Sequence, residues 1–153
     1  MWVPPEDKDP LLLQAPTRHS VACFGAVNLR TGQFVRHICT IFNAQIFRRS
    51  LKQLLRYQRG RRRMIVVLDN ARYHHAVLLK PFLPKHAKQL RLLFLPPYSP
   101  QLASIERVWK LARRLATHNR YFPALEEVLK AVNACFDRWR RPNRVLRKPC
   151  CIN

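Results

Sequence analysis

The stretch MIVVLD, residues 64–69, determines the predicted fold class because it is a short, continuous apolar run that ends in a carboxylate. Such a run is typical of a β-strand that is buried on both faces of a sheet. In open α/β sheets, ligands gather at the carboxyl ends of the strands, so Asp69 is a candidate metal ligand or catalytic residue. The alternative is that Asp69 only caps the helix that follows.

The residues around this strand predict further elements of both kinds. Apolar alternation indicates strands, apolar spacing of three and four indicates helices, and proline and glycine mark their ends. The predicted elements, in chain order, are a β-hairpin at 20–42, a helix capped by Asn43 and stopped near Gly60, the strand at 64–69, a short helix broken by Pro81 and Pro84, a second buried strand at 90–95, a helix with an apolar stripe from Ile105 to Leu115, and a last helix from Leu125 that Pro142 ends. This order predicts an α/β fold with a mixed sheet flanked by helices.

The chain is strongly basic. Its 153 residues include 29 Lys and Arg but only 8 Asp and Glu, which gives a net charge of +21. The isoelectric point of about 11.3 lies well above the value of about 9 that suggests a nucleic-acid-binding domain. A polyanionic partner is therefore expected, although a basic structural RNA-binding protein would carry the same charge.

The sequence also bears on the cellular compartment. No apolar run approaches the ~20 residues that cross a bilayer, and the first ten residues lack the layout of a signal peptide. The five cysteines are odd in number and contain no CxxC pattern, which indicates reduced thiols and leaves a zinc site as the less favoured alternative. We therefore expect a cytoplasmic protein with no membrane partner.

Most of the eight acidic residues have a structural explanation. These are an irregular lead-in for Glu6, Asp7 and Asp9, the helix dipole for Glu126 and Glu127, and neighbouring arginines for Asp137. Asp69 and Glu106 remain. Glu106 also has a structural alternative, since Lys110 follows it by four residues and such a pair stabilises a helix by roughly 0.2 to 0.5 kcal/mol.

Glu106 follows a turn that is rich in proline, within LPPYSPQLASIERVW at residues 95–109. Pro96, Pro97 and Pro100 fix the φ angle and reduce the freedom of the chain, so a stiff segment delivers the carboxylate. Carboxylate oxygens are hard ligands that hold magnesium beside phosphates. Two such acids in a protein suited to a polyanion favour phosphoryl-transfer chemistry.

Together, VVLDNARYHHA (66–76) and LPPYSPQLASIERVWK (95–110) resemble the second and third acidic motifs of the DDE transposases, specifically the bacterial insertion-sequence enzymes of the mariner-type superfamily. The separation of 37 positions between Asp69 and Glu106 is similar to that of the family, and the resemblance extends from Trp2 to the last helix. It implies an RNase H-like fold and metal-dependent DNA cleavage and joining in transposition. It also implies a cytoplasmic bacterial protein that is nucleoid-associated when bound to DNA.

The resemblance also implies roles for individual residues. Asp69 and Glu106 would be the second and third catalytic acids and would ligate Mg²⁺ or Mn²⁺, with two ions expected in the complete enzyme. The supporting residues would be Asn70, His74, Tyr98 and Pro100. The DNA-binding residues are expected to be Arg72, Lys110, Arg113 and Arg114, with the element ends and the target as the DNA partners.

The chain departs from the family pattern at its start. The first catalytic Asp of the family lies on a central strand ahead of the segment that residues 1–10 resemble, so we expect an N-terminally truncated chain that lacks this strand. The predicted organisation is a lead-in (1–19), an incomplete catalytic domain (20–141) and a C-terminal tail (142–153). Without its first acid the chain is expected to be inactive alone. The alternative is a non-catalytic, basic nucleic-acid-binding remnant.

Three further expectations follow from these departures. Unpaired strand edges predict a marginal fold or self-association. Without a helix-turn-helix region, DNA binding should be electrostatic and weakly specific. Family members commonly have Asn-Pro where this chain has Ala103 and Ser104, so Ser104 is the available N-cap. That cap would move Glu106 from the third helical position to the second.

Overall fold

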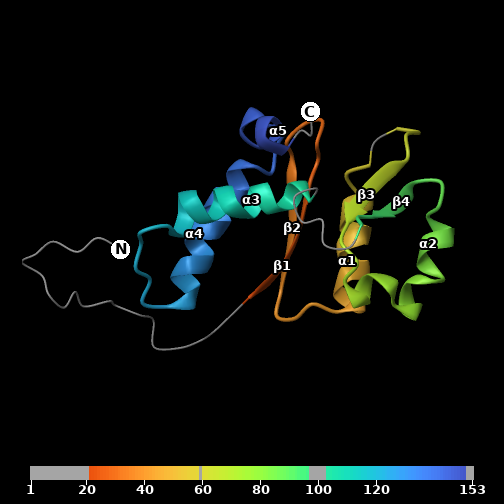
Figure 1. Cartoon of the computed structure of the whole chain (residues 1–153), viewed down its shortest axis with the longest axis horizontal. Helices are drawn as coiled ribbons and strands as arrows, with labels where there is room; N and C mark the ends of the chain where they lie inside the picture. The colour runs from red at the N-terminus through yellow and green to blue at the C-terminus, as the bar shows by residue number, and fades with distance from the viewer. Residues whose placement is uncertain (1–20, 59, 97–102, 151–153) are drawn as a thin grey trace, which may run out of the picture.

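Two pairs of strands form the centre of the molecule, and helices flank them (Figure 1). The computed structural model describes residues 21–58, 60–96 and 103–150. Its mixture of strands and helices confirms the predicted α/β class. The arrangement of the strands differs from the prediction in ways that affect the candidate site.

The first pair is the predicted hairpin. Strands β1 (Ala22–Val27) and β2 (Phe34–Cys39) are antiparallel, with Ala22 opposite Cys39. The connecting turn contains Gly32 at a φ of 72°, a left-handed conformation that favours glycine. Successive side chains of a strand point to opposite faces, so the hairpin presents two faces for packing.

Helix α1 (Ala44–Leu55) covers one of these faces. It begins where the sequence predicted, because the side chain of Asn43 accepts a hydrogen bond from the backbone N–H of Ile46 at 2.8 Å. The helix ends five residues before Gly60, where the chain turns with a φ of 74°. The buried cluster under α1 contains Phe47, Leu51, Leu79, Phe82 and Leu90, against which partly buried residues such as Phe24, Val66 and Leu92 pack.

The second pair consists of β3 (Met64–Leu68) and β4 (Leu90–Phe94), which are parallel. The connection between them contains the 3₁₀ turns η1 (Arg72–His75) and η2 (Val77–Leu79) and the short helix α2 (Phe82–Lys85). One proline precedes α2 and another lies within it, and proline removes a backbone donor. The break near Pro81 is as predicted, but 3₁₀ turns take the place of the expected helix before it, and Pro84 lies inside α2.

The single mixed sheet that the sequence predicted is divided into two sheets. The ladder partner of β1 is β2 and that of β3 is β4, with no hydrogen bonds between the pairs. Helix α1 joins them instead, because its cluster takes side chains from both, including Phe24 of β1 and Val66 of β3. Among the described residues no strand lies between the pairs. Each of the four strands therefore has one edge without a ladder partner among the described residues.

The prediction that β3 and β4 are buried on both faces is wrong. Ile65, Val67 and Leu93 are 60%, 44% and 49% exposed, and the register places Val67 beside Leu93. We call these three residues the exposed apolar face. The alternate residues of both strands pack under α1. The C-terminal helices pack on the hairpin instead, so no described helix covers this face of the second sheet.

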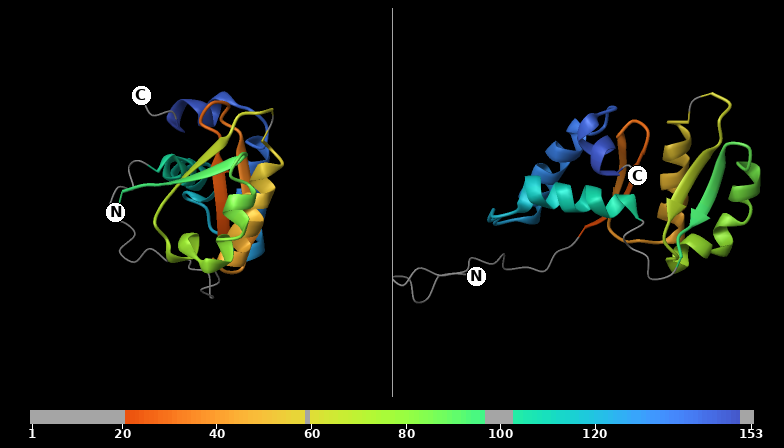
Figure 2. Two further views of the ribbon diagram at one scale, coloured as in Figure 1. Left: turned by 90° about the vertical axis from the view of Figure 1, so that its right-hand side faces the viewer. Right: turned by 45° about the horizontal axis from the view of Figure 1, so that its top comes forward.

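The other face of the hairpin is covered by the C-terminal helices (Figure 2). These elements are α3 (Ser104–Ala112), the π-helical turn η4 (Arg113–Thr117), α4 (Leu125–Arg138) and α5 (Arg144–Cys150). Their buried cluster contains Phe34, Val108, Ala112, Ala116, Cys135, Phe136, Trp139, Leu146 and Cys150. The hairpin therefore separates α1 from α3.

Gly25 of β1 allows α3 to approach the hairpin closely. A Cβ atom at this position would lie 2.5 Å from the Trp109 ring and 2.8 Å from the Phe34 ring. Those two rings meet edge to face, with centroids 5.7 Å apart. Because Glu106 and Trp109 belong to the same helix, the absence of a side chain at Gly25 helps to set the position of Glu106.

The predicted apolar stripe of the α3 helix ends differently. Leu115 is 43% exposed, whereas Ala116 is only 3% exposed. The reason is the π-helical turn, which contains more residues per turn than an α-helix and so shifts the buried face by about one residue.

The predicted tail at 142–153 contains a packed helix. Leu146 and Cys150 of α5 are fully buried in the core of the C-terminal helices. The side chain of Asn143 accepts a hydrogen bond from the backbone N–H of Leu146 at 2.9 Å and donates one to the carbonyl of Gly32 at 2.8 Å. Asn143 therefore both caps α5 and joins it to the hairpin turn.

Asp137 does not pair with its neighbouring arginines. One of its carboxylate oxygens instead lies 3.0 Å from the guanidinium of Arg36 on β2. That guanidinium also lies over the Phe136 ring, 5.6 Å from its centroid. The prediction failed because it considered only sequence neighbours, whereas the packing of α4 on the hairpin supplies the partner.

Candidate functional site

Asp69 directly follows β3, at the carboxyl end of the parallel pair. Its side chain is 72% exposed. Oδ1 accepts a hydrogen bond from the backbone N–H of Ala71 at 3.2 Å and also lies 3.1 Å from Nδ1 of His74. Ala71 is the N-cap residue of η1 and has no side-chain cap, so Asp69 does not cap that turn. Within the described residues, its Oδ2 atom has no hydrogen-bond partner.

His74 contacts the Asp69 carboxylate from the interior of the protein. The side chain is only 7% exposed, and its Nδ1 lies 3.0 Å from the backbone carbonyl of Asp69 in addition to Oδ1. The rings of Phe47 and Tyr73 enclose the imidazole, with centroids 4.3 and 4.4 Å away. Burial lowers the pKa of His74, although its contacts with Asp69 act in the opposite direction. We therefore describe the contact as a hydrogen bond from a neutral imidazole and not as an ion pair.

Asn70 joins the ends of the two parallel strands. Its side-chain amide donates to the carbonyl of Leu95 at 2.7 Å, and the N–H of Leu95 donates to the carbonyl of Leu68 at 2.8 Å. The chain after β4 therefore leaves the sheet beside Asp69. Tyr98 and Pro100, which were expected to support the turn, lie outside the described residues.

Glu106 is the third residue of α3 and is exposed. The N-cap position is occupied by Ala103, which has no side-chain cap, and the N–H of Glu106 donates to the carbonyl of Ala103 at 3.0 Å. The expectation that Ser104 would become the N-cap is therefore wrong. The helix begins at Ser104, because backbone hydrogen bonding alone closes the first turn.

The charge around Glu106 is unbalanced. In the part of the chain that the structure describes, Glu106 has no ion pair, and the expected partner Lys110 makes none either. An acid in the first turn interacts favourably with the helix dipole, which partly stabilises it there. The proposed i,i+4 pair thus does not account for this carboxylate.

The four candidate DNA-binding residues are all exposed. Arg72 opens η1, three residues after Asp69, and Lys110 lies on α3, one turn after Glu106. Arg113 and Arg114 are not on the α-helical part of this segment but in the π-helical turn. No acidic side chain neutralises any of the four within the described residues.

Comparison with known proteins identifies the family. The sequence matches the DDE superfamily endonuclease family over residues 1–129. The chain belongs to this family. A protein from Sinorhizobium fredii (strain NBRC 101917 / NGR234), named uncharacterized protein y4pE/y4sA, is 28% identical over 118 residues, which cover 77% of this chain and 82% of that protein. No solved structure matches the chain.

The DDE superfamily acts on DNA, and its endonucleases generally depend on divalent metal ions. Asp69 and Glu106 offer the oxygen ligands that such ions prefer. The described residues, however, contain no group of three or more His, Cys, Asp or Glu side chains that is arranged to hold a metal. The two carboxylates therefore have suitable chemistry, but the described part of the chain does not assemble a complete ligand set around them.

His74 is a supporting residue in the sequence-based prediction, but its burial and its contacts with Asp69 were not predicted. Two aromatic neighbours and a double contact with Asp69 make it a buried anchor. The available signal was the sequence RYHHA directly after Asp69, since a short turn returns the fifth residue to the end of the strand. In the described residues, no helix of this DDE superfamily member is long and apolar enough to cross a membrane.

Proposed function

We propose that this DDE superfamily member takes part in the metal-dependent cleavage and joining of DNA strands during transposition. The observation that carries the proposal is the Asp69 carboxylate, which is fixed at the carboxyl end of β3 by His74 while Oδ2 faces no partner among the described residues. Glu106, in the first turn of α3, supplies the other carboxylate of the proposed site.

The residues of the chain have distinct parts in this proposal. Asp69 and Glu106 would hold Mg²⁺ or Mn²⁺, two ions in the complete enzyme, and the metal would activate the attacking oxygen and stabilise charge on the phosphate. His74 orients Asp69, and Asn70 fixes the strand ends beside it. Tyr98 and Pro100 are proposed to direct the turn before α3.

The exposed cations of this region would hold the DNA. Lys110, Arg113 and Arg114 follow Glu106 along one segment, and Arg72 lies close to Asp69 in sequence. They would contact the phosphates of element ends and target DNA, so binding should weaken steeply with salt. In a bacterial cytoplasm such a protein would associate with the nucleoid.

We also propose that the chain self-associates. The exposed apolar face and the strand edges without ladder partners support this, since both kinds of surface favour pairing with another chain.

A second candidate function is DNA binding without catalysis. The net charge of +21 supports binding. Asp69 and Glu106 are not joined by a third metal-ligating side chain in the described part of the chain, which favours this alternative for the chain acting alone.

A nicking assay distinguishes the two candidates. The full chain is incubated with supercoiled plasmid and Mg²⁺ or Mn²⁺, beside Asp69→Asn and Glu106→Gln. The control is Glu127→Gln, which removes one exposed acid from the first turn of α4 and leaves the site intact. Catalysis predicts nicking by the wild type and the control, with a loss of at least about a hundredfold in both site variants.

Each result has a defined meaning. Nicking that survives Asp69→Asn and Glu106→Gln would reject the assigned acids. DNA binding without nicking by the wild type would establish the non-catalytic alternative. A wild-type chain that neither binds nor nicks DNA would reject both candidates.

A further inference from the structure

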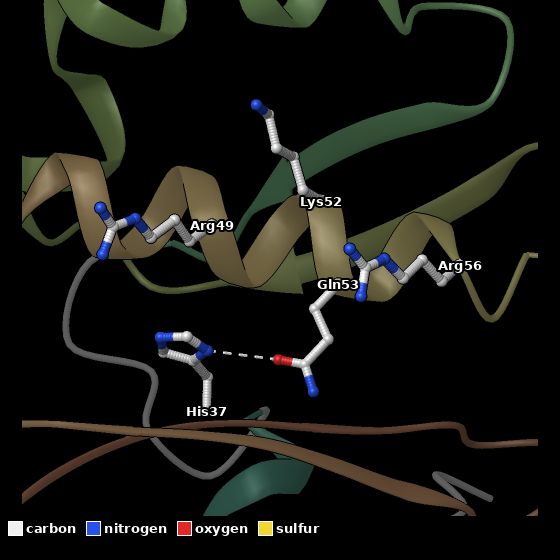
Figure 3. Close-up of a pocket in the computed structure, with 5 residues that line it drawn as sticks. All are labelled: His37, Arg49, Lys52, Gln53 and Arg56. Carbon is white, nitrogen blue, oxygen red and sulfur yellow. Dashed lines mark hydrogen bonds between the residues drawn. The ribbon is translucent and has the colours of Figure 1, made fainter.

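A pocket between β2 and α1 lies outside the proposed catalytic site. It is lined by His37 from the hairpin and by Arg49, Lys52, Gln53 and Arg56 from α1 (Figure 3). Its volume is about 260 Å³, far above the roughly 10–15 Å³ that a single water needs. The pocket therefore has room for a polyatomic anion together with its hydration water.

The three cations of the pocket form one row along α1. They are spaced by three and four residues, which places them on the same side of a helix. All three are exposed, and no acid pairs with them among the described residues. The sequence contains no Asp or Glu between Asp9 and Asp69, so neither the hairpin nor α1 holds an acid that neutralises this row.

The polar residues of the pocket are held in place. The side-chain amide of Gln53 donates to the carbonyl of Arg36 at 3.1 Å, so its Oε1 is available to accept from Nδ1 of His37 at 3.3 Å. This assigns the hydrogen to Nδ1. The other ring nitrogen of His37 faces the side of the pocket on which Arg49 lies (Figure 3). A pocket with two hydrogen-bonded polar side chains and three exposed cations is suited to an anion.

We propose that this pocket binds a phosphodiester group of duplex DNA and forms a second DNA contact. Arg49 and Arg56 lie seven residues apart, roughly 10 Å along the helix axis. A row of this length can contact more than one phosphate of a strand, whereas a single small anion would use only part of it. The described residues that line the pocket include no Phe, Tyr or Trp on which an unpaired base could stack, which favours duplex over single-stranded DNA.

The second contact is on the opposite face of the hairpin from α3. Phe24 of β1 packs under α1, whereas its neighbour Gly25 faces Trp109 of α3. Lys110, on the same helix as Trp109, and the cations of α1 therefore belong to different sides of the hairpin. The inference shares DNA as a partner with the proposed function but none of its residues, so each can fail alone.

The test compares two triple variants of equal charge. Arg49→Gln, Lys52→Gln and Arg56→Gln remove the row, and Arg61→Gln, Arg62→Gln and Arg63→Gln remove three exposed cations that do not line the pocket. Binding to a short DNA duplex is measured at several salt concentrations. Each lost phosphate contact makes the plot of log affinity against log salt less steep by about 0.9. The slope of the pocket variant should therefore be smaller in magnitude than that of the wild type by about 2 to 3.

The outcomes separate the pocket from general charge. A pocket variant that loses slope while the 61–63 variant changes by less than about 1 supports the proposal. Equal losses in both variants, or an unchanged slope in the pocket variant, would overturn it. Tighter binding of the wild type to duplex RNA or to single-stranded DNA would also overturn the assignment to duplex DNA.

Two further variants connect the result to this structure. Gln53→Glu keeps the size of the side chain and an acceptor for His37 but adds a carboxylate, so DNA affinity should fall by at least about tenfold. Unchanged affinity would contradict the pocket. Glu127→Gln should leave the salt slope intact, because Glu127 lies on α4 and outside the pocket, and circular dichroism verifies that every variant is folded.

Discussion

At the scale of single residues, His74 links the fold to the candidate site. It is buried between the rings of Phe47 and Tyr73, yet both of its contacts with Asp69 run toward the exposed end of β3. Protonation would place a charge inside this apolar surrounding, which explains why burial lowers the pKa of His74. The orientation of Asp69 therefore depends on a neutral imidazole.

The lowered pKa predicts a pH-dependent stability. The unfolded chain binds a proton near the ordinary histidine value of 6.5, whereas folded His74 binds it only at lower pH. The contribution of His74 to the free energy of unfolding is thus fully present above about pH 6.5 and is lost as the pH falls toward the pKa of folded His74. Thermal unfolding between pH 7.5 and 5 should show this loss.

The variant His74→Gln should reduce that loss, because it keeps a donor for Asp69 but cannot titrate in this range. At pH 7.5 it should cost about 1 to 3 kcal/mol through poorer hydrogen bonding. Parallel melting curves of the wild type and the variant across the whole pH range would contradict a role for His74.

The sequence singles out Asp69 and Glu106 as candidates but does not predict their surroundings. Asp69 and Glu106 stand out because acids are scarce and because each follows a recognisable local signal, a strand end and a proline-rich turn. The burial of His74 depends on Phe47, which lies on a helix far earlier in the chain. Local patterns carry no information about such a contact.

At the scale of elements, the close approach of β1 and α3 is the most demanding packing contact. Gly25→Ala would place a methyl group about 2.5 Å from the Trp109 ring. Because the ring must move, we expect a loss of about 1 to 3 kcal/mol, measured by denaturant unfolding. The displacement of α3 should also reduce any activity that uses Glu106.

A double variant tests the cause. The added methyl meets the outer ring atoms of Trp109, which phenylalanine lacks. Gly25→Ala in a Trp109→Phe background should therefore cost less than in the wild type, giving a measurable coupling energy. Equal costs in the two backgrounds would mean that the clash is relieved in another way.

Element positions were predicted where the signal is local. The hairpin and the Asn43 cap are present because turn and cap residues act within a few positions. The exposed apolar face was not predicted, because the apolar residues Ile65 and Val67 are expected to be buried in a strand. Which helices cover the sheet cannot be known from this local pattern. Likewise, Ala116 and not Leu115 is buried because of a π-helical turn, which has no clear sequence signal.

At the scale of the whole molecule, the exposed apolar face predicts association between chains. Sedimentation of the wild type should show an apparent mass that rises with protein concentration. Ile65→Thr with Val67→Thr keeps the β-branched shape of both side chains but makes them more polar. Because a buried Ile or Val contributes roughly 1.5 to 3 kcal/mol, association should weaken by at least about tenfold.

The control replaces two other exposed valines. Val77 and Val145 are 71% and 54% exposed and lie outside the exposed apolar face. Val77→Thr with Val145→Thr should leave association unchanged. A wild-type protein that remains a monomer at every concentration would refute the proposed self-association.

The joining of the hairpin to α5 has a consequence for protein synthesis. The carbonyl of Gly32 accepts a hydrogen bond from Asn143, and Phe34 lies in the same buried cluster as Leu146. Both partners follow more than a hundred positions later in the chain. At roughly 5 to 20 residues per second, the ribosome needs several seconds to complete the intervening chain. During that time one face of the hairpin cannot receive its final covering, whereas the cluster under α1 is complete once β4 has emerged. The nascent chain should therefore depend most on chaperones late in its translation.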